Sequence, residues 1–186
     1  GHYIDTKHPI ITENIMGIKR KLGVKQTSKK PILINDLKKI INVINEEKNE
    51  LKKYQNKALI LIGFAGGFRR SELVSIEYED VDFVEEGVKL TVTKSKTDQT
   101  GIGLTKAIPY FENKTYCPVI SLKKWIEYSN IKNGKVFKVS DKTVALTIKK
   151  YASIAGLDNS KYAGHSLRSG FATSTAEIGA DERSIM

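Results

Sequence analysis

Two short segments carry side chains suited to chemistry on a phosphate. The first, GGFRRSEL, holds Arg69 and Arg70, with Glu72 three residues after Arg69. The second, GHSLR, holds His165 and Arg168, which would share one face of a helix. Guanidinium groups bind phosphate oxygens bidentately, and imidazole exchanges protons near neutral pH. The residue types therefore indicate metal-free chemistry on a phosphodiester, although each motif alone also fits an ordinary helix.

Arginine is scarce in this chain, which makes its positions informative. The chain has 31 Lys and Arg against 21 Asp and Glu, and arginine occurs only at Arg20, Arg69, Arg70, Arg168 and Arg183. Lysine supplies a solvated point charge, whereas arginine supplies a planar, permanently charged fork. Each arginine is therefore a candidate for a task that needs such a fork.

Composition restricts the class of protein. With 186 residues and 40% hydrophobic content, the chain can bury one core. A net charge of +10 and a pI near 9.5 favour a nucleic-acid partner over a membrane, because no basic amphipathic helix or membrane-spanning run stands out. Cys117 is the sole cysteine, which excludes an internal disulfide and suits a reducing compartment. We expect a cytoplasmic, nucleoid-associated protein.

Apolar spacing predicts a mostly helical chain. Leu37, Ile40, Ile41 and Ile44 indicate an amphipathic helix that Asn35 would cap and that would run to about Glu50. Further helices are expected around Ile11 to Ile18, within NKALILIGFAGG, after Arg70, from Pro118, from Asp141, and from His165 to Gly179.

Between Tyr78 and Pro109 the apolar period changes to two. Val88, Leu90 and Val92 alternate with polar residues, and EEG and SKTDQTG supply turns. We expect about three antiparallel strands. The predicted fold class is α+β, mostly helical, with a small antiparallel β-sheet.

Two other patterns indicate no function. Asp80 and Asp82 could mimic a metal pair, but no third ligand accompanies them, so a solvated strand face is expected. GIGLTK begins like a phosphate-binding loop but has Lys106 where a glycine is needed, and so it is assigned no function.

Taken in order, GGFRRSEL, the lysine-bearing TVTKSKTDQTG and GHSLRSGFAT resemble the catalytic domain of the tyrosine recombinases, the phage integrase family. The resemblance runs from about Pro31 to the last residue. The first motif of that family has the form Gly-hydrophobic-Arg-x-Ser-Glu-Leu. The resemblance implies that Arg69 is catalytic and that Glu72 supports it, while Arg70 contacts DNA.

The same resemblance assigns the remaining roles. It places a catalytic lysine, the proton donor to the leaving oxygen, at Lys96, with Lys94 as the alternative or a DNA contact. It makes His165 and Arg168 catalytic as well. It implies no nucleotide or metal cofactor, duplex DNA as partner, and no membrane.

The nucleophilic tyrosine of the family follows the His-x-x-Arg helix, but every tyrosine here precedes His165. Tyr151 and Tyr162 are expected to be packing residues. We therefore expect residues 31–186 to be a catalytic domain that is incomplete at its C-terminus. Residues 1–30 are expected to be the tail of an upstream domain with a basic linker.

The implied activity is site-specific cleavage and rejoining of DNA through a 3′-phosphotyrosyl intermediate. The resemblance also implies a synaptic tetramer on DNA in the full-length protein. Two alternatives stay open at this point. One is an enzyme like a type IB topoisomerase, and the other is a noncatalytic DNA-binding module or decayed integrase.

Overall fold

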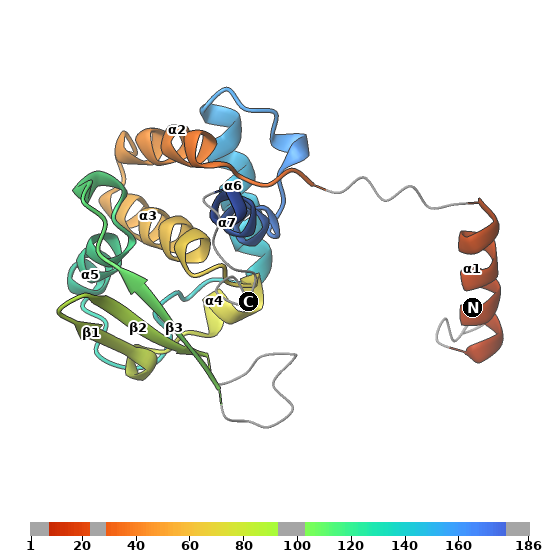
Figure 1. Ribbon diagram of the computed structural model, residues 1–186, viewed down its shortest axis with the longest axis horizontal. Coiled ribbons are helices and arrows are strands. Elements are labelled where there is room, and N and C mark those ends of the chain that lie inside the picture. The colour runs from red at the N-terminus through yellow and green to blue at the C-terminus, as the bar shows by residue number, and fades with distance from the viewer. Residues whose placement is uncertain (1–7, 23–28, 93–102, 178–186) are drawn as a thin grey trace.

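The computed structural model describes residues 8–22, 29–92 and 103–177. A helical body packs against one small sheet, and α1 lies apart from this body (Figure 1). The α-helices of the described part are α1 (Pro9–Leu22), α2 (Ile34–Asn45), α3 (Glu50–Ala65), α4 (Arg70–Ser75), α5 (Pro118–Ser129), α6 (Asp141–Ile154) and α7 (Ser166–Glu177). The strands are β1 (Val81–Val84), β2 (Gly87–Val92) and β3 (Leu104–Pro109).

The amphipathic helix α2 differs from its prediction at both ends. It buries the four predicted apolar side chains, but it begins at Ile34, so that Asn35 lies inside the helix and does not cap it. It ends at Asn45 because a new helix starts soon afterwards. The side chain of Asn49 accepts the backbone N–H of Lys52 at 3.0 Å and caps α3.

Helix α3 lies at the centre of the body and contacts α2, α5 and α7. Every residue from Ala58 to Phe64 is buried, as expected for a helix that is apolar on all sides. The helix ends at its glycines as predicted, with Gly66 as C-cap and Gly67 in the left-handed region at a φ of +53°.

The sheet has the order β1-β2-β3 with both pairs antiparallel. Val88, Leu90 and Val92 of β2 are buried, which confirms the predicted period of two. Asp82 is exposed on β1 as expected, whereas Asp80 ends a short 3₁₀ turn, where its carboxylate accepts the N–H of Glu77.

The C-terminal helices also follow the sequence. Pro118 occupies the first turn of α5, and Ser140 caps α6 by accepting the N–H of Thr143 at 3.1 Å. Helix α7 is described as far as Glu177, so the predicted end at Gly179 lies outside the described residues. The fold class, mostly helical with a three-stranded antiparallel sheet, is confirmed.

Candidate active site

The site is built on the turn that follows α3. A Cβ on Gly67 would lie 2.8 Å from the Phe171 ring, so this position requires glycine for its contacts as well as for its φ. The carbonyls of Gly66 and Gly67 sit at the C-terminal end of a 16-residue helix, where the helix dipole is negative. The turn therefore offers a backbone site for cations.

Arg69 follows this turn in an extended conformation and precedes the first residue of α4. Its guanidinium Nη1 lies 2.7 Å from Glu72 Oε1, and its backbone N–H donates to Glu72 Oε2 at 2.8 Å. The carboxylate thus fixes both the side chain and the backbone of Arg69. A supporting role of Glu72 in catalysis stays a prediction.

Glu72 is a buried carboxylate, with only 5% of its side chain exposed. Burial by itself raises the pKa of Glu72, but two hydrogen bonds from Arg69 and the charges of Arg69 and Lys106 outweigh it. The pKa of the carboxyl is held below its ordinary value. Glu72 is therefore ionised at neutral pH and keeps Arg69 oriented.

Arg168 reaches the same turn from α7. Its Nη1 donates to the carbonyl of Gly67 at 2.8 Å, and the side chain is half-buried. Leu167 anchors the helix, because its Cδ1 would lie 2.9 Å from a Cβ on Gly63 of α3. The glycine allows α3 and α7 to approach closely, which brings Arg168 to the turn beside Arg69.

Lys106 is a third cation at the turn, and the sequence interpretation missed it. Its Nζ donates to the Gly66 carbonyl at 2.7 Å and lies 4.7 Å from the centre of the Phe68 ring. A signal for it was available: Lys106 stands between Leu104 and Ile108 on alternate residues of a strand, a position where an apolar side chain is the norm.

Arg70 contacts other residues than Arg69 does. Its aliphatic stem packs on Gly164 so tightly that a Cβ there would overlap it, and its Nη2 lies 3.9 Å from Asp141 Oδ2. Arg70 therefore connects α4 and α6 to the segment that carries His165. A DNA contact by Arg70 stays a prediction.

His165 is exposed and precedes the first residue of α7, where its carbonyl accepts the N–H of Ser169 at 3.0 Å. Its catalytic role stays a prediction. Lys96 and Lys94 lie outside the described residues, so neither can be placed relative to the arginines. Strands β2 and β3, which flank that segment, are paired as far as Val92 and Leu104.

The two tyrosines nearest to His165 in sequence are buried, as predicted for packing residues. Tyr162 donates to Asp36 at 2.8 Å; burial, followed by this hydrogen bond, raises the pKa of its phenol to about 12. Tyr151 donates to Glu47 at 2.9 Å, and its pKa is also raised, mainly by burial. Both phenols are bound to carboxylates and are poor nucleophiles.

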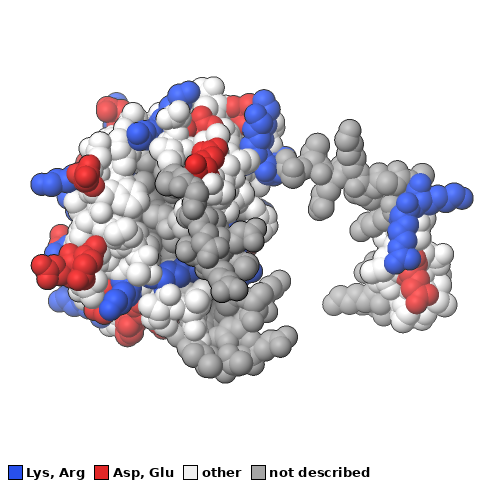
Figure 2. Space-filling model, viewed as in Figure 1, with Lys and Arg blue, Asp and Glu red and all other residues white. Residues whose placement is uncertain are grey.

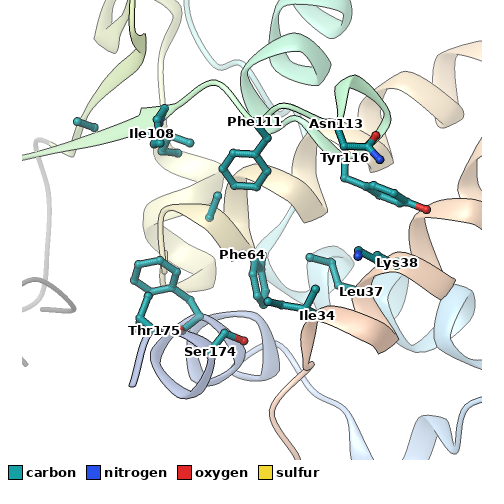
Figure 3. A pocket seen from close by; sticks show the side chains of 14 residues that line it. Ile34, Leu37, Lys38, Phe64, Ile108, Phe111, Asn113, Tyr116, Ser174 and Thr175 are labelled. Atoms are coloured by element: carbon teal, nitrogen blue, oxygen red, sulfur yellow. Dashed lines mark hydrogen bonds between the residues drawn. The ribbon is translucent and has the colours of Figure 1, made fainter. Parts of the chain in front are cut away.

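An apolar cavity of about 470 Å³ adjoins the turn through Phe171. Figure 3 shows side chains from α2, α3, α7 and the segment after β3 around it. Ser174 supplies a buried hydroxyl that has no hydrogen-bond partner among the described residues. The lining of this cavity is mainly apolar.

Charge on the surface is mixed. Figure 2 shows basic and acidic side chains interspersed on one face of the molecule. Within the described ranges, no cluster of three or more histidine, cysteine or acidic side chains could hold a metal ion. None of the described helices is long and apolar enough to span a membrane.

The site has two guanidinium groups and an ammonium around one glycine turn, on a mostly helical domain with a small sheet. Residues 32–186 match the sequence profile of the phage integrase family, and the chain belongs to that family, the tyrosine recombinases. It is 42% identical over 198 residues to the integrase/recombinase XerD homolog of Selenomonas ruminantium, with all of this chain and 58% of that protein covered.

A more distant relative is tyrosine recombinase XerA of Pyrococcus horikoshii, which is 28% identical over 156 residues, covering 84% of this chain and 50% of XerA. The chain thus spans about half the length of these relatives.

Solved structures agree in fold. The XerH site-specific recombinase bound to its difH substrate, before cleavage, superposes with a TM-score of 0.68 at 20% identity, over 85% of this chain and 46% of XerH. The catalytic core of lambda integrase superposes with a TM-score of 0.59 at 18% identity, over 84% of this chain and 88% of the core.

Proposed function

We propose that the protein to which this chain belongs is a site-specific DNA recombinase that cuts and rejoins duplex DNA through a 3′-phosphotyrosyl intermediate. The observation that carries the proposal is the approach of Arg69 and Arg168 to one turn, each oriented by a short hydrogen bond to Glu72 or to Gly67. Two oriented guanidinium groups can stabilise the charge that develops on phosphate oxygens during attack.

A tyrosine oxygen attacks the phosphorus, the bond from phosphorus to the 5′ oxygen breaks, and the leaving oxygen takes a proton from Lys96. His165 accepts the proton of the tyrosine hydroxyl. Rejoining reverses these transfers when a 5′ hydroxyl attacks the phosphotyrosine.

The nucleophile in this scheme is a tyrosine outside the printed sequence. All eight tyrosines precede His165, and the phenols of Tyr151 and Tyr162 are bound to carboxylates. We assign residues 31–186 to the catalytic domain and residues 1–30 to an upstream domain and linker.

Duplex DNA carrying a recombination site is the proposed partner, with a tetramer as the working assembly. The net charge of +10 supports DNA binding, and the related XerH was solved on its DNA substrate. The affinity of this chain for duplex DNA should fall at least about tenfold between about 50 and 200 mM salt, because phosphate contacts release counterions. An affinity that does not change with salt would contradict this part of the proposal.

The deciding experiment uses a nicked suicide substrate that carries the cognate site, followed by denaturing electrophoresis. The complete protein should form a covalent adduct, and this 186-residue chain alone should bind without forming one. An adduct at any tyrosine of this chain would overturn the assignment of the nucleophile. Relaxation of supercoiled DNA without site preference would instead indicate a topoisomerase.

A further inference from the structure

Lys106 occupies a position that the sheet otherwise fills with apolar side chains. Its partner on β2 is the buried Leu90, and the next pair on the same face joins Val88 to the buried Ile108. Lysine is rarely buried, because its charged form loses hydration. The half-buried ammonium therefore needs a compensating interaction, which points to a role for its charge.

That interaction is with the backbone of the arginine turn. The Nζ atom lies 2.7 Å from the Gly66 carbonyl and 3.4 Å from the Gly67 carbonyl. The Gly67 carbonyl is also the acceptor for Arg168. Lys106 and Arg168 thus share one acceptor, and Lys106 connects β3 to the turn that precedes Arg69.

The electrostatics agree with this position. Burial lowers the pKa of Lys106, the negative charge of Glu72 opposes that effect, and the positive charges of Arg168 and Arg69 add to it. The charges of Glu72, Arg69 and Arg168 therefore all act on the Lys106 ammonium.

We propose that Lys106 is a positioning residue of the recombinase, which holds the Gly66–Gly67 turn so that Arg168 and Arg69 meet the scissile phosphate in the correct orientation. The inference rests on the proposed function. Lys106 thereby ties β3, the strand that follows Lys96 in the sequence, to the turn of the arginines. Lys106 does not donate a proton to the leaving group.

The test compares Lys106→Met, which keeps length but loses charge, with Lys106→Arg, which keeps charge and donors. Lys89→Met is the matched control, because Lys89 is exposed on the adjacent strand opposite Ala107. Single-turnover cleavage by the complete protein is measured on the normal site and on one with sulfur in place of the 5′ bridging oxygen. A thiolate leaves without needing a proton.

Lys106→Met should slow cleavage by about 10- to 100-fold, equally on both substrates, with DNA affinity changed less than about twofold. Lys106→Arg should recover most of the rate, and Lys89→Met should match the wild type. The melting temperature of Lys106→Met should fall by no more than about 4 °C, because methionine suits the apolar face while the Gly66 carbonyl loses a hydrogen bond. The cleavage rate of Lys96→Met should recover only on the sulfur substrate.

Two results would overturn the inference. Cleavage by Lys106→Met at the wild-type rate would show that the turn does not need Lys106, and recovery of Lys106→Met on the sulfur substrate would make Lys106 a proton donor.

If the wild type itself forms no adduct, the proposed function fails. The positioning role is then decided by the Arg168 guanidinium NMR signals of this chain, which Lys106→Met should shift and Lys106→Arg should preserve. Unchanged signals in both variants would reject it.

Discussion

The two ends of α3 hold positive charge in different ways. In the first turn, Lys53 pairs with the exposed Glu50 at 2.6 Å, and further along, in the middle of the helix, Lys57 donates to the side chain of Asn45 at 2.8 Å. At the C-terminal end, Arg168 and Lys106 donate to backbone carbonyls of the glycine turn. One end uses side-chain partners, and the other uses the backbone itself.

The difference has a physical basis. Lys53 sits beside the positive pole of the helix dipole and Lys57 lies in the middle of the helix, so neither is stabilised by the dipole. The cations at the C-terminal end meet the negative pole and acceptors of fixed position. Backbone acceptors cannot rotate away, so the C-terminal end can hold a charged group in one direction, which catalysis on a phosphate needs.

The largest expected effect comes from replacing the planar guanidinium of Arg69 with the ammonium of a lysine. Arg69→Lys in the complete protein should lower the cleavage rate by about 100- to 1,000-fold, because one ammonium cannot hold two transition-state oxygens. DNA affinity, measured by titration at fixed salt, should change much less.

Arg70→Lys is the neighbouring control. Lysine keeps an aliphatic stem beside Gly164 and a charge near Asp141, so cleavage should stay within about fivefold of the wild type, the size of an exposed ion pair. Equal damage from both substitutions would mean that the catalytic arginine is wrongly assigned.

The turn itself can be tested through Gly67→Ala. The substitution adds a Cβ at a φ of +53° and 2.8 Å from Phe171, so it should lower the free energy of unfolding by about 2–3 kcal/mol. Gly134→Ala shares the positive φ, at +67°, but has open space around it, and should cost only about 1–2 kcal/mol. Urea unfolding of this chain measures both, and equal losses would contradict a clash with Phe171.

Glu72→Gln weakens the interaction that orients Arg69 but keeps the shape of the side chain at position 72. The substitution should lower the free energy of unfolding by about 1–3 kcal/mol at pH 7. Because the pKa of Glu72 is lowered in the folded state, its contribution is full above the ordinary value of 4.5 and is lost as pH falls through the folded pKa. The difference between the variant and the wild type should therefore shrink in acid, as followed by urea unfolding across pH.

Sequence patterns predicted the helices and the three strands, because these depend on local periodicity and short spacing. The pairing of Glu72 with Arg69 was implied by the family resemblance, and its role in catalysis stays a prediction. The start of α2 at Ile34 was missed, since Asn35 is a good cap by type but the chain enters the helix earlier. Lys106 was missed for another reason. Its place among apolar strand residues was a signal, but its partners, the carbonyls of Gly66 and Gly67, are far away in sequence and belong to the backbone, so residue type did not show what it contacts.

The smallest expected effect lies in the middle of α3, at Lys57, and it tests whether the charge there is dispensable. Burial lowers the pKa of Lys57, and the positive charges of Lys124 and Lys53 lower it further. A lysine whose folded pKa is lowered destabilises the fold while it is protonated, and this cost disappears as pH rises through the folded pKa toward the ordinary value of 10.5. Lys57→Met removes that cost at neutral pH but also loses the hydrogen bond to Asn45. The melting temperature should therefore stay within about 2 °C of the wild type, and it should rise less with added salt, because less repulsion is left to screen. A large fall in the melting temperature would show that the fold depends on the charge of Lys57 as well as on the cations at the C-terminal end of α3.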